Sequence, residues 1–188
     1  MTRIPGTWLA AAAILGAASD AAAQAPSATP PPAGARAAAC SGAEFRQFDF
    51  WVGEWEVTSG HGQVAGVNRI TPILRGCVLH EEWRGANGGS GQSFNMYDAA
   101  TGKWRQTWVA DNGVLLLLEG TLVAGSMVLT GRRPAPQKPG VTLLDRITWT
   151  PLELGDVRQL WEVSEDGGTS WRTVFDGRYA KRGRTGSP

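Results

Sequence analysis

Short segments in which apolar and polar residues alternate fill most of the chain beyond residue 50, and they constrain its fold more than any other feature. Alternation with a period of two is typical of a β-strand with one buried face. Roughly ten such segments follow one another at a spacing of about 8–12 residues, with Gly-, Asn- and Asp-rich turns between them. Strands are expected over residues 51–57, 64–74, 76–84, 92–97, 103–110, 114–119, 126–130, 141–150, 157–164 and 171–178.

No helical pattern between these segments is long enough to connect two parallel strands. Consecutive strands should therefore pair in antiparallel fashion, and closure of the sheet on itself removes its free edges. The sequence predicts an all-β fold, an antiparallel up-and-down (meander) barrel of about ten strands. An open sandwich of two sheets is the alternative, although no disulfide or Trp pattern of the immunoglobulin type supports it.

The most aromatic window of the chain is FDFWVGEWEV, residues 48–57, where an irregular segment becomes the first strand. Just upstream, Ser41 and Glu44 have the spacing of a capping box, which opens a helical turn. We therefore expect a short N-terminal helical plug that closes one end of the barrel.

The two ends of the chain differ in composition from the segments between them. Residues 1–25 have the charged start, short apolar run and small-x-small ending of a signal peptide. Residues 26–39 are rich in Pro and Ala, which is typical of a disordered linker. These features predict a barrel domain over residues 40–182, a disordered tail over residues 183–188, and a periplasmic or secreted location. An uncleaved membrane helix is the alternative, but the apolar run is short for a span, so no membrane anchor is expected after cleavage.

The charge balance excludes one large class of partner. The chain has 18 Lys and Arg against 17 Asp and Glu, a net charge of +1, and no long run of like charge. Nucleic acid is therefore not expected as a partner. The two histidines, His61 and His80, and the two cysteines lack the ligand spacing of a zinc site, so neither a metal nor a cofactor is expected.

Cys40 and Cys77 are the only cysteines. An even count in an exported protein predicts a disulfide, which would tie the segment that enters the barrel to the third strand. Two buried free thiols are the alternative.

The turn between the last two strands, residues 164–171, resembles an Asp-box, a hairpin known from sialidase propellers. Asp166 and Gly168 would form the turn and Trp171 would pack beneath it. In those enzymes the motif lies away from the chemistry, so we interpret these residues as structural.

Gly53 and Trp55 form a Gly-x-Trp motif at the start of the first strand. It resembles the motif of the calycins (lipocalins, fatty-acid-binding proteins and relatives), in which the Trp packs across the barrel floor against a cation from the last strands. The resemblance implies a calycin-like barrel, with Arg178 or Arg158 as that cation. The wider pattern, which includes GCVLHEEW, FNMYDAATGKWRQTW and VFDGRY, is similar to an exported bacterial family of calycin-like barrels without an assigned function. That family has no agreed catalytic residues to carry over.

Aromatic and polar side chains share the face that should point inward with Trp55. A barrel of this size can enclose one small ligand, and an apolar wall with a few polar groups is typical of a ligand site. The sequence therefore predicts a carrier or sensor of an amphipathic or aromatic small molecule. The alternative is a barrel filled by its own side chains. The expected ligand-binding residues are Glu81, Trp83, Trp104, Gln106, Trp108, Asp145, Trp149, Gln159 and Trp161, with Trp171 and Tyr179 on the same face.

Two further functions stay open at this point. Glu81 and Asp145 could form a buried carboxylate pair for acid–base catalysis, although Arg146 and Arg158 could instead neutralise them, and no catalytic nucleophile is assigned. A haem-binding barrel similar to nitrobindin is the other hypothesis. Such barrels use a His near the end of the chain, whereas the last His here is His80.

Overall fold

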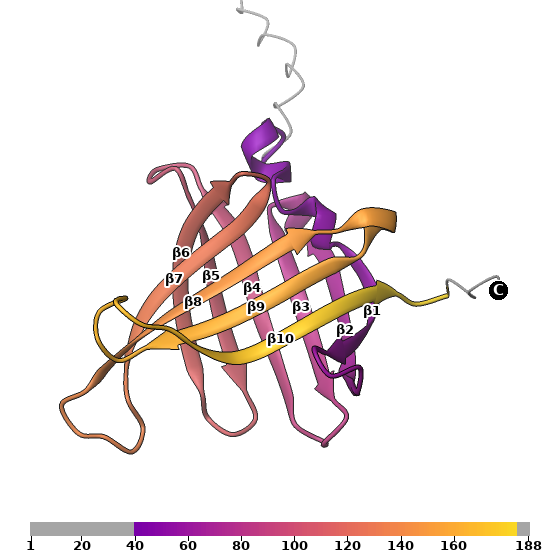
Figure 1. The fold of residues 1–188 in the computed structure, drawn as a ribbon. Coiled ribbons are helices and arrows are strands. Elements are labelled where there is room, and N and C mark those ends of the chain that lie inside the picture. Colours follow the sequence, from indigo (N-terminus) through magenta and orange to yellow (C-terminus); the bar gives the residue numbers. More distant parts are fainter. Residues whose placement is uncertain (1–39, 184–188) are drawn as a thin grey trace, which may run out of the picture. The chain divides into compact units, whose positions relative to one another are not determined.

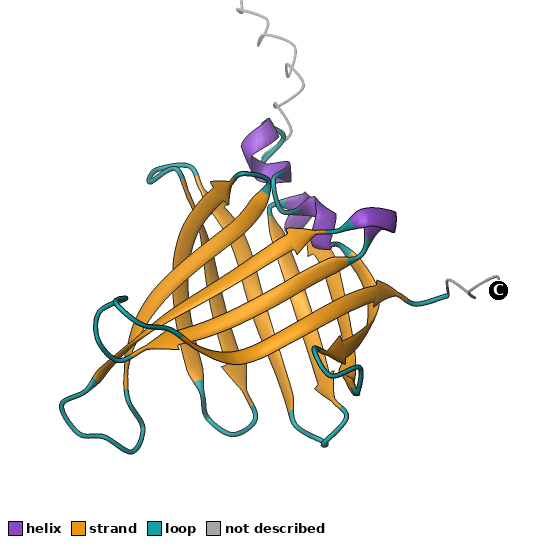
Figure 2. Cartoon of the chain, viewed as in Figure 1, coloured by secondary structure: helices purple, strands orange, loops and turns teal. Residues whose placement is uncertain are grey.

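The computed structural model describes residues 40–183 as one closed β-barrel (Figure 1, Figure 2). The expected signal peptide, the linker and all of the tail beyond Gly183 lie outside the described residues. The ten strands are β1 (Gly53–Ser59), β2 (Val64–Ile73), β3 (Val78–Gly85), β4 (Ser90–Asp98), β5 (Lys103–Ala110), β6 (Leu115–Val123), β7 (Ser126–Pro134), β8 (Thr142–Pro151), β9 (Val157–Ser164) and β10 (Arg172–Lys181).

Each strand pairs in antiparallel fashion with its neighbours in the sequence, and β1 pairs with β10 to close the barrel. The predicted antiparallel meander barrel is therefore confirmed, and the sandwich alternative is wrong. Closure gives β1 a hydrogen-bonded neighbour on both sides: Trp55 of β1 lies opposite Lys181 of β10 and opposite Asn68 of β2. No edge is left to pair with another chain.

Alternating burial explains why these sequences form this sheet. In β8, Leu143, Asp145, Ile147 and Trp149 are buried, and the residues between them face outward and are only half-buried. This is the period expected for strands that cover one core.

Two short 3-10 helices, η1 (Ala43–Arg46) and η2 (Asp49–Trp51), precede β1 and form the plug. Phe48 and Trp51 are completely buried, and their rings stack 4.9 Å apart. The predicted helical plug is confirmed, but the predicted capping box is not. Gly42 caps η1, and no side chain caps that helix, because it begins one residue later than the Ser41 pattern requires.

A disulfide joins Cys40 to Cys77, as predicted, with the Cα atoms 5.2 Å apart. Cys77 follows the 3-10 helix η3 (Leu74–Gly76), which connects β2 to β3 at the same end of the barrel as the plug. Arg46 strengthens this connection, because its guanidinium donates to the backbone carbonyls of Cys40 and Gly76.

A bulge in β10 changes which face its first residues occupy. Thr173 pairs with Glu162 and Phe175 with Trp161, so Val174 has no partner across the ladder. A bulge inverts the facing of every residue on one side of it. Trp171, predicted to point inward like Tyr179, therefore lies outside the barrel, where the Arg146 guanidinium sits 3.8 Å from its ring centre.

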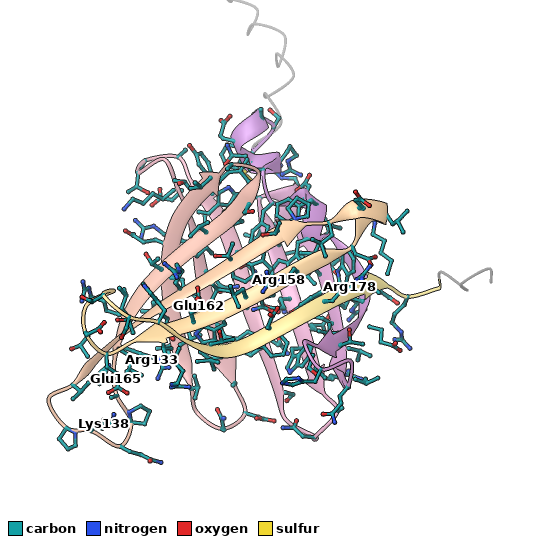
Figure 3. All side chains as sticks on the ribbon, in the orientation of Figure 1. Arg133, Lys138, Arg158, Glu162, Glu165 and Arg178 are labelled. Carbon is teal, nitrogen blue, oxygen red and sulfur yellow. A yellow bond between two sulfur atoms is a disulfide. The ribbon has the colours of Figure 1, made fainter. Side chains whose placement is uncertain are left out.

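Ion pairs cover the outer surface (Figure 3). The bidentate pair between Arg158 and Asp176 and the pair between Arg146 and Glu162 each bridge neighbouring strands. A further 3-10 helix, η4 (Glu153–Gly155), connects β8 to β9. Within residues 40–183, none of the helices is long and apolar enough to span a membrane.

Candidate functional site

The barrel contains a cavity of about 230 Å³. Its lining side chains come from β3, β5, β6, β8, β9 and β10, so it lies inside the sheet. Val174 lines it and is 40% exposed, which places an opening beside the β10 bulge. The lining residues are Glu81, Trp83, Gln106, Trp108, Leu116, Ile147, Gln159, Trp161, Val174, Phe175 and Tyr179.

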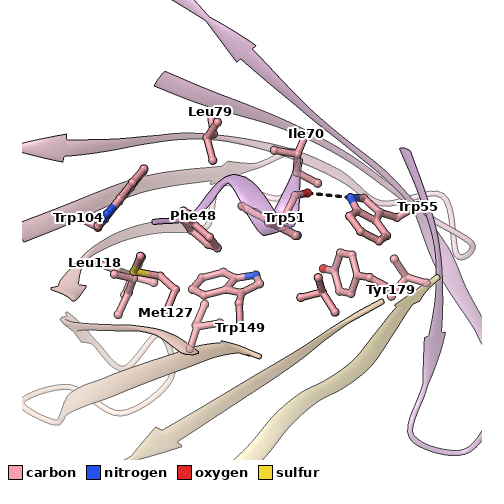
Figure 4. Close-up of a cluster of buried hydrophobic side chains, with 14 of the residues drawn as sticks. Phe48, Trp51, Trp55, Ile70, Leu79, Trp104, Leu118, Met127, Trp149 and Tyr179 are labelled. Atoms are coloured by element: carbon pink, nitrogen blue, oxygen red, sulfur yellow. Dashed lines mark hydrogen bonds between the residues drawn. The ribbon is translucent and has the colours of Figure 1, made fainter. Parts of the chain in front are cut away.

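The plug decides which part of the interior stays open. Phe48 makes edge contacts with Trp104 and Trp149, with ring centres 5.6 and 5.2 Å away (Figure 4). The indole N–H of Trp104 also donates to Gln47, which precedes Phe48. Trp104 and Trp149 were predicted to line the ligand site, and the structure instead packs them against the plug.

Trp55 belongs to this closed end too. Its indole N–H donates to the carbonyl of Trp51 over 2.9 Å, and its ring contacts the edge of Tyr179. The cation beside Trp55 is Lys181, 5.5 Å from its ring centre. The expectation of Arg178 or Arg158 at this place is wrong, because Arg178 pairs with Asp156 and Arg158 pairs with Asp176.

Glu81 is the acidic residue of the cavity wall. It lies in the middle of β3, opposite Ser93 of β4, and is only 4% exposed. Both of its carboxylate oxygens accept hydrogen bonds: Oε1 from the amide of Asn68 at 2.8 Å and Oε2 from the hydroxyl of Ser93 at 2.5 Å. Burial raises the pKa of the Glu81 carboxyl to about 7, against the opposing effect of these two hydrogen bonds.

The hydrogen bond from Ser93 is the last of a series across three strands. The amide of Gln106 donates to the carbonyl oxygen of Asn95 at 2.8 Å, and the amide of Asn95 donates to the hydroxyl oxygen of Ser93 at 2.8 Å. Since that hydroxyl oxygen already accepts a hydrogen bond, its own hydrogen is free to point at Glu81. Asn68, Ser93 and Asn95 were not among the predicted site residues. Each lies on the inward face of its strand, directly opposite a predicted residue of the next strand: Trp83, Glu81 and Gln106, respectively.

Tyr179 and Gln159 supply further polar atoms to the lining. The hydroxyl of Tyr179 donates to the side-chain carbonyl of Gln159. Burial, together with the nearby charge of Glu81, raises the pKa of Tyr179 well above its usual value, so its hydroxyl stays protonated.

Asp145 does not join Glu81 in the cavity wall. Arg133 of β7 pairs with it through two hydrogen bonds, of 2.9 and 3.3 Å, and the indole of Trp161 donates to it over 2.8 Å. The hypothesis of a catalytic pair formed by Glu81 and Asp145 therefore lacks its second carboxylate. The neutralising cation is Arg133, not Arg146 or Arg158, which both form their ion pairs elsewhere.

Gly91 and Gly177 leave space for two aromatic rings of the wall, those of Trp108 and Phe175. A Cβ atom on Gly91 would lie 2.3 Å from the ring of Trp108, and one on Gly177 would lie 2.5 Å from the ring of Phe175. Each ring therefore packs directly over the backbone of a neighbouring residue. A glycine on the inward face of a strand, next to an aromatic position, was the sequence signal for these close contacts.

Of the nine predicted ligand-binding residues, six line the cavity: Glu81, Trp83, Gln106, Trp108, Gln159 and Trp161. Sequence reasoning missed four apolar members of the wall, Leu116, Ile147, Val174 and Phe175. Val174 joins the wall because of the bulge, Phe175 shares the inward parity of Tyr179, and Leu116 and Ile147 look like ordinary core residues.

The residues present do not fit haem or a metal ion. His80 lies on the outer face, where its ring stacks on Phe94 and hydrogen-bonds to Gln92, and His61 lies in the exposed turn after β1. No His, Cys or Met is among the lining residues, so the cavity offers none of these axial ligands to a haem iron. The cavity is also smaller than the sites that usually hold drug-sized ligands, and haem is larger than such ligands. Among residues 40–183 no cluster of three His, Cys, Asp or Glu side chains could hold a metal.

The residues of the predicted Asp-box close a turn far from Glu81 in the sequence. The Asp166 carboxylate accepts from the backbone N–H of Ser170 at 2.9 Å, and the indole of Trp171 donates to the carbonyl of Gly168. Hydrogen bonds from Ser164 and Ser170 hold the pKa of Asp166 well below its usual range. These contacts stay within the hairpin, and none of its residues lines the cavity.

No protein-family model matches this sequence, and a search of curated proteins finds no match to it either. The function therefore has to be inferred from the cavity and its chemistry.

Proposed function

We propose that the protein is an exported β-barrel that binds a small apolar or amphipathic molecule in its interior. One observation carries the proposal: a closed barrel keeps about 230 Å³ of space, walled by aromatic rings, by the buried polar groups of Glu81 and Gln106 and by the half-buried Gln159. Protein interiors are close-packed and contain few voids larger than a water molecule, so a space of this size stands out from the rest of the core. A designed apolar cavity of about 150 Å³ is already large enough to bind benzene.

Export is supported by the disulfide and by the sequence of the N-terminus. The Cys40–Cys77 bond is of a kind that persists in oxidising compartments such as the periplasm. The charged start and short apolar run of residues 1–25 have the pattern of a signal peptide.

Membership of a calycin-like family is part of this proposal. It is supported by the Gly53-x-Trp55 motif, by the helical plug before it and by Lys181 beside the Trp55 ring. The φ angle of Gly53, +148°, lies in a region that L-residues rarely adopt, which explains the glycine of the motif.

The test uses tert-butylbenzene, a neutral probe of ten carbon atoms, and follows tryptophan fluorescence and the melting temperature. We expect saturable quenching and a higher melting temperature, because a ligand that binds only the folded state stabilises it. Leu116→Phe places a larger side chain in the cavity and should weaken both effects. The matched control is Leu117→Phe, which adds the same atoms to the next residue, on the outer face and 59% exposed. Equal binding by both folded variants would overturn the proposal, and so would a wild type that binds neither tert-butylbenzene nor its cationic analogue phenyltrimethylammonium.

A further inference from the structure

We infer that the ligand is a small organic cation, an amine or quaternary ammonium with an apolar group, and that Glu81 is its counter-ion within an aromatic cage. This inference rests on the proposed function and specifies the ligand class. Three observations point to it: the donors around Glu81, the absence of a protein cation beside it, and the rings that share its cavity.

The hydrogen bonds around Glu81 are arranged for a negatively charged carboxylate. The Asn68 amide nitrogen can only donate, and the Ser93 hydroxyl, which accepts from Asn95, directs its own hydrogen at Glu81. Each carboxylate oxygen therefore receives a donor from the protein. A carboxylate can accept about four hydrogen bonds, so it keeps acceptor capacity for a donor in the cavity.

No Lys or Arg of residues 40–183 forms an ion pair with Glu81, and nearby His80 has the smallest of the effects that lower its pKa. Among residues 40–183, the other two buried acidic side chains each have an arginine, Asp145 with Arg133 and Asp156 with Arg178. Glu81 is in no ion pair within that range. A buried charge without a partner is strongly unfavourable. A cationic ligand in the cavity would therefore stabilise the charged form of Glu81.

The titratable groups around Glu81 do not alter this conclusion. Tyr179 of β10 faces it and stays neutral, and His80 is its neighbour in β3 but points outward. The inward residues of β2, β4 and β9 nearest the network are Asn68, Ser93 and Gln159, none of which is charged.

Aromatic rings form much of the remaining wall. Trp83, Trp108, Trp161 and Phe175 line the same cavity as Glu81, and the rings of Trp83 and Phe175 meet edge to face, 6.3 Å apart. The face of an aromatic ring carries partial negative charge and attracts cations, Trp most strongly. Such a wall favours an organic cation over a neutral molecule of equal shape, and it disfavours an anion.

The size of the cavity selects the probe. Phenyltrimethylammonium and tert-butylbenzene have the same shape. They differ in one atom, because the first has a positively charged nitrogen where the second has a carbon. Phenyltrimethylammonium cannot lose a proton, so any pH dependence of its binding comes from the protein. We expect it to bind at least tenfold more tightly than tert-butylbenzene at pH 8.5, measured by calorimetry or tryptophan fluorescence.

The pH dependence of this affinity is a second measurement that needs no variant. Protonation of Glu81, with its pKa near 7 in the empty barrel, competes with cation binding. The affinity for phenyltrimethylammonium should therefore fall as the pH drops below 7, approaching tenfold for each pH unit. The affinity for tert-butylbenzene should not fall in this way.

Glu81→Gln should reduce the affinity for phenyltrimethylammonium at least tenfold and leave that for tert-butylbenzene within threefold. The matched control is Glu82→Gln, which removes the next carboxylate along β3, paired outside the barrel with Arg69. It should leave both affinities unchanged. If tert-butylbenzene binds as tightly as the cation, or if the cation's affinity is the same at pH 5.5 and pH 8.5, the cation inference is wrong while the proposed function stands. If neither probe binds, both fail.

Discussion

The hydroxyl of Ser93 donates to the carboxylate of Glu81 over 2.5 Å, inside a barrel in which no Lys or Arg of residues 40–183 pairs with this carboxylate. The donor lowers the cost of the buried charge but does not remove it, because burial still raises the Glu81 pKa to about 7. Glu81 is therefore held at the border between its two protonation states at neutral pH. A change in pH, or a charged molecule in the cavity, decides which state it adopts.

The first prediction concerns stability against pH. Between the ordinary carboxyl pKa of 4.5 and about 7, the folded state keeps the Glu81 proton and the unfolded state has lost it. The free energy of unfolding therefore falls as the pH rises through this window, by about 3 kcal/mol from Glu81 alone. Urea denaturation from pH 4.5 to 8 measures it. Glu81→Gln should lose this slope, and parallel curves for wild type and variant would contradict the prediction.

The second prediction concerns the other buried carboxylate. Arg133→Gln leaves Asp145 buried without its cation, so we expect the variant to lose about 3 kcal/mol of stability in urea denaturation. The control is Arg158→Gln, which breaks a more exposed pair with Asp176 and should cost at most about 1 kcal/mol. Adding Asp145→Asn to Arg133→Gln should restore most of the loss. Equal losses in the two arginine variants would show that burial of Asp145 does not matter.

Alternation alone was enough to predict the barrel, because ten short amphipathic strands joined by turns have few other ways to bury one face. It also brought Glu81, Trp83 and Trp108 to the right wall. It could not show how deeply the plug enters. Whether Trp104 and Trp149 meet a ligand or Phe48 depends on contacts between segments far apart in the sequence.

The bulge at Val174 was the second limit. One unpaired residue moves Trp171 to the outer face and adds Val174 to the wall beside Phe175, and nothing in the composition of β10 marks its position. Ion-pair partners were the third limit. Several arginines occur near the right strands, and only the register decides that Arg133 reaches Asp145 and that Lys181 reaches Trp55.

The third prediction concerns the closed end of the barrel. Trp55 is completely buried and hydrogen-bonds to the Trp51 carbonyl, so Trp55→Ala should cost about 3–5 kcal/mol. Chemical denaturation measures the loss. Phe94→Ala is the control, since Phe94 is 52% exposed on the outer face and its removal should cost far less. An unchanged melting temperature for Trp55→Ala would exclude a stabilising role for this residue.

The fourth prediction concerns the disulfide, which closes a loop between residues 37 positions apart. A cross-link over this length lowers the conformational entropy of the unfolded chain, which stabilises the folded state by about 4 kcal/mol. The double variant Cys40→Ser/Cys77→Ser should lose most of this, and dithiothreitol should destabilise the wild type to the same extent but leave the double variant unaffected. Two free thiols in denatured, unreduced wild-type protein would contradict the bond itself.

The last prediction links the backbone to the cavity. A Cβ on Gly91 would lie 2.3 and 2.5 Å from two ring atoms of Trp108 and 2.9 Å from the carbonyl oxygen of Val109. Since that strand backbone is fixed by its ladder, the Trp108 ring has to move in Gly91→Ala. We expect a loss of roughly 1–3 kcal/mol in stability from this overpacking. We also expect a changed near-ultraviolet circular dichroism spectrum and at least tenfold weaker binding of tert-butylbenzene.

Gly60→Ala is the matched control for this variant. It makes the same change in the turn between β1 and β2, where the nearest atom to the new Cβ would be 3.8 Å away. It should therefore leave the spectrum and the affinity as they are in the wild type. If Gly91→Ala folds with an unchanged tryptophan spectrum and undiminished affinity, the Trp108 ring does not help to form the binding wall, and the aromatic cage around Glu81 loses one of its sides.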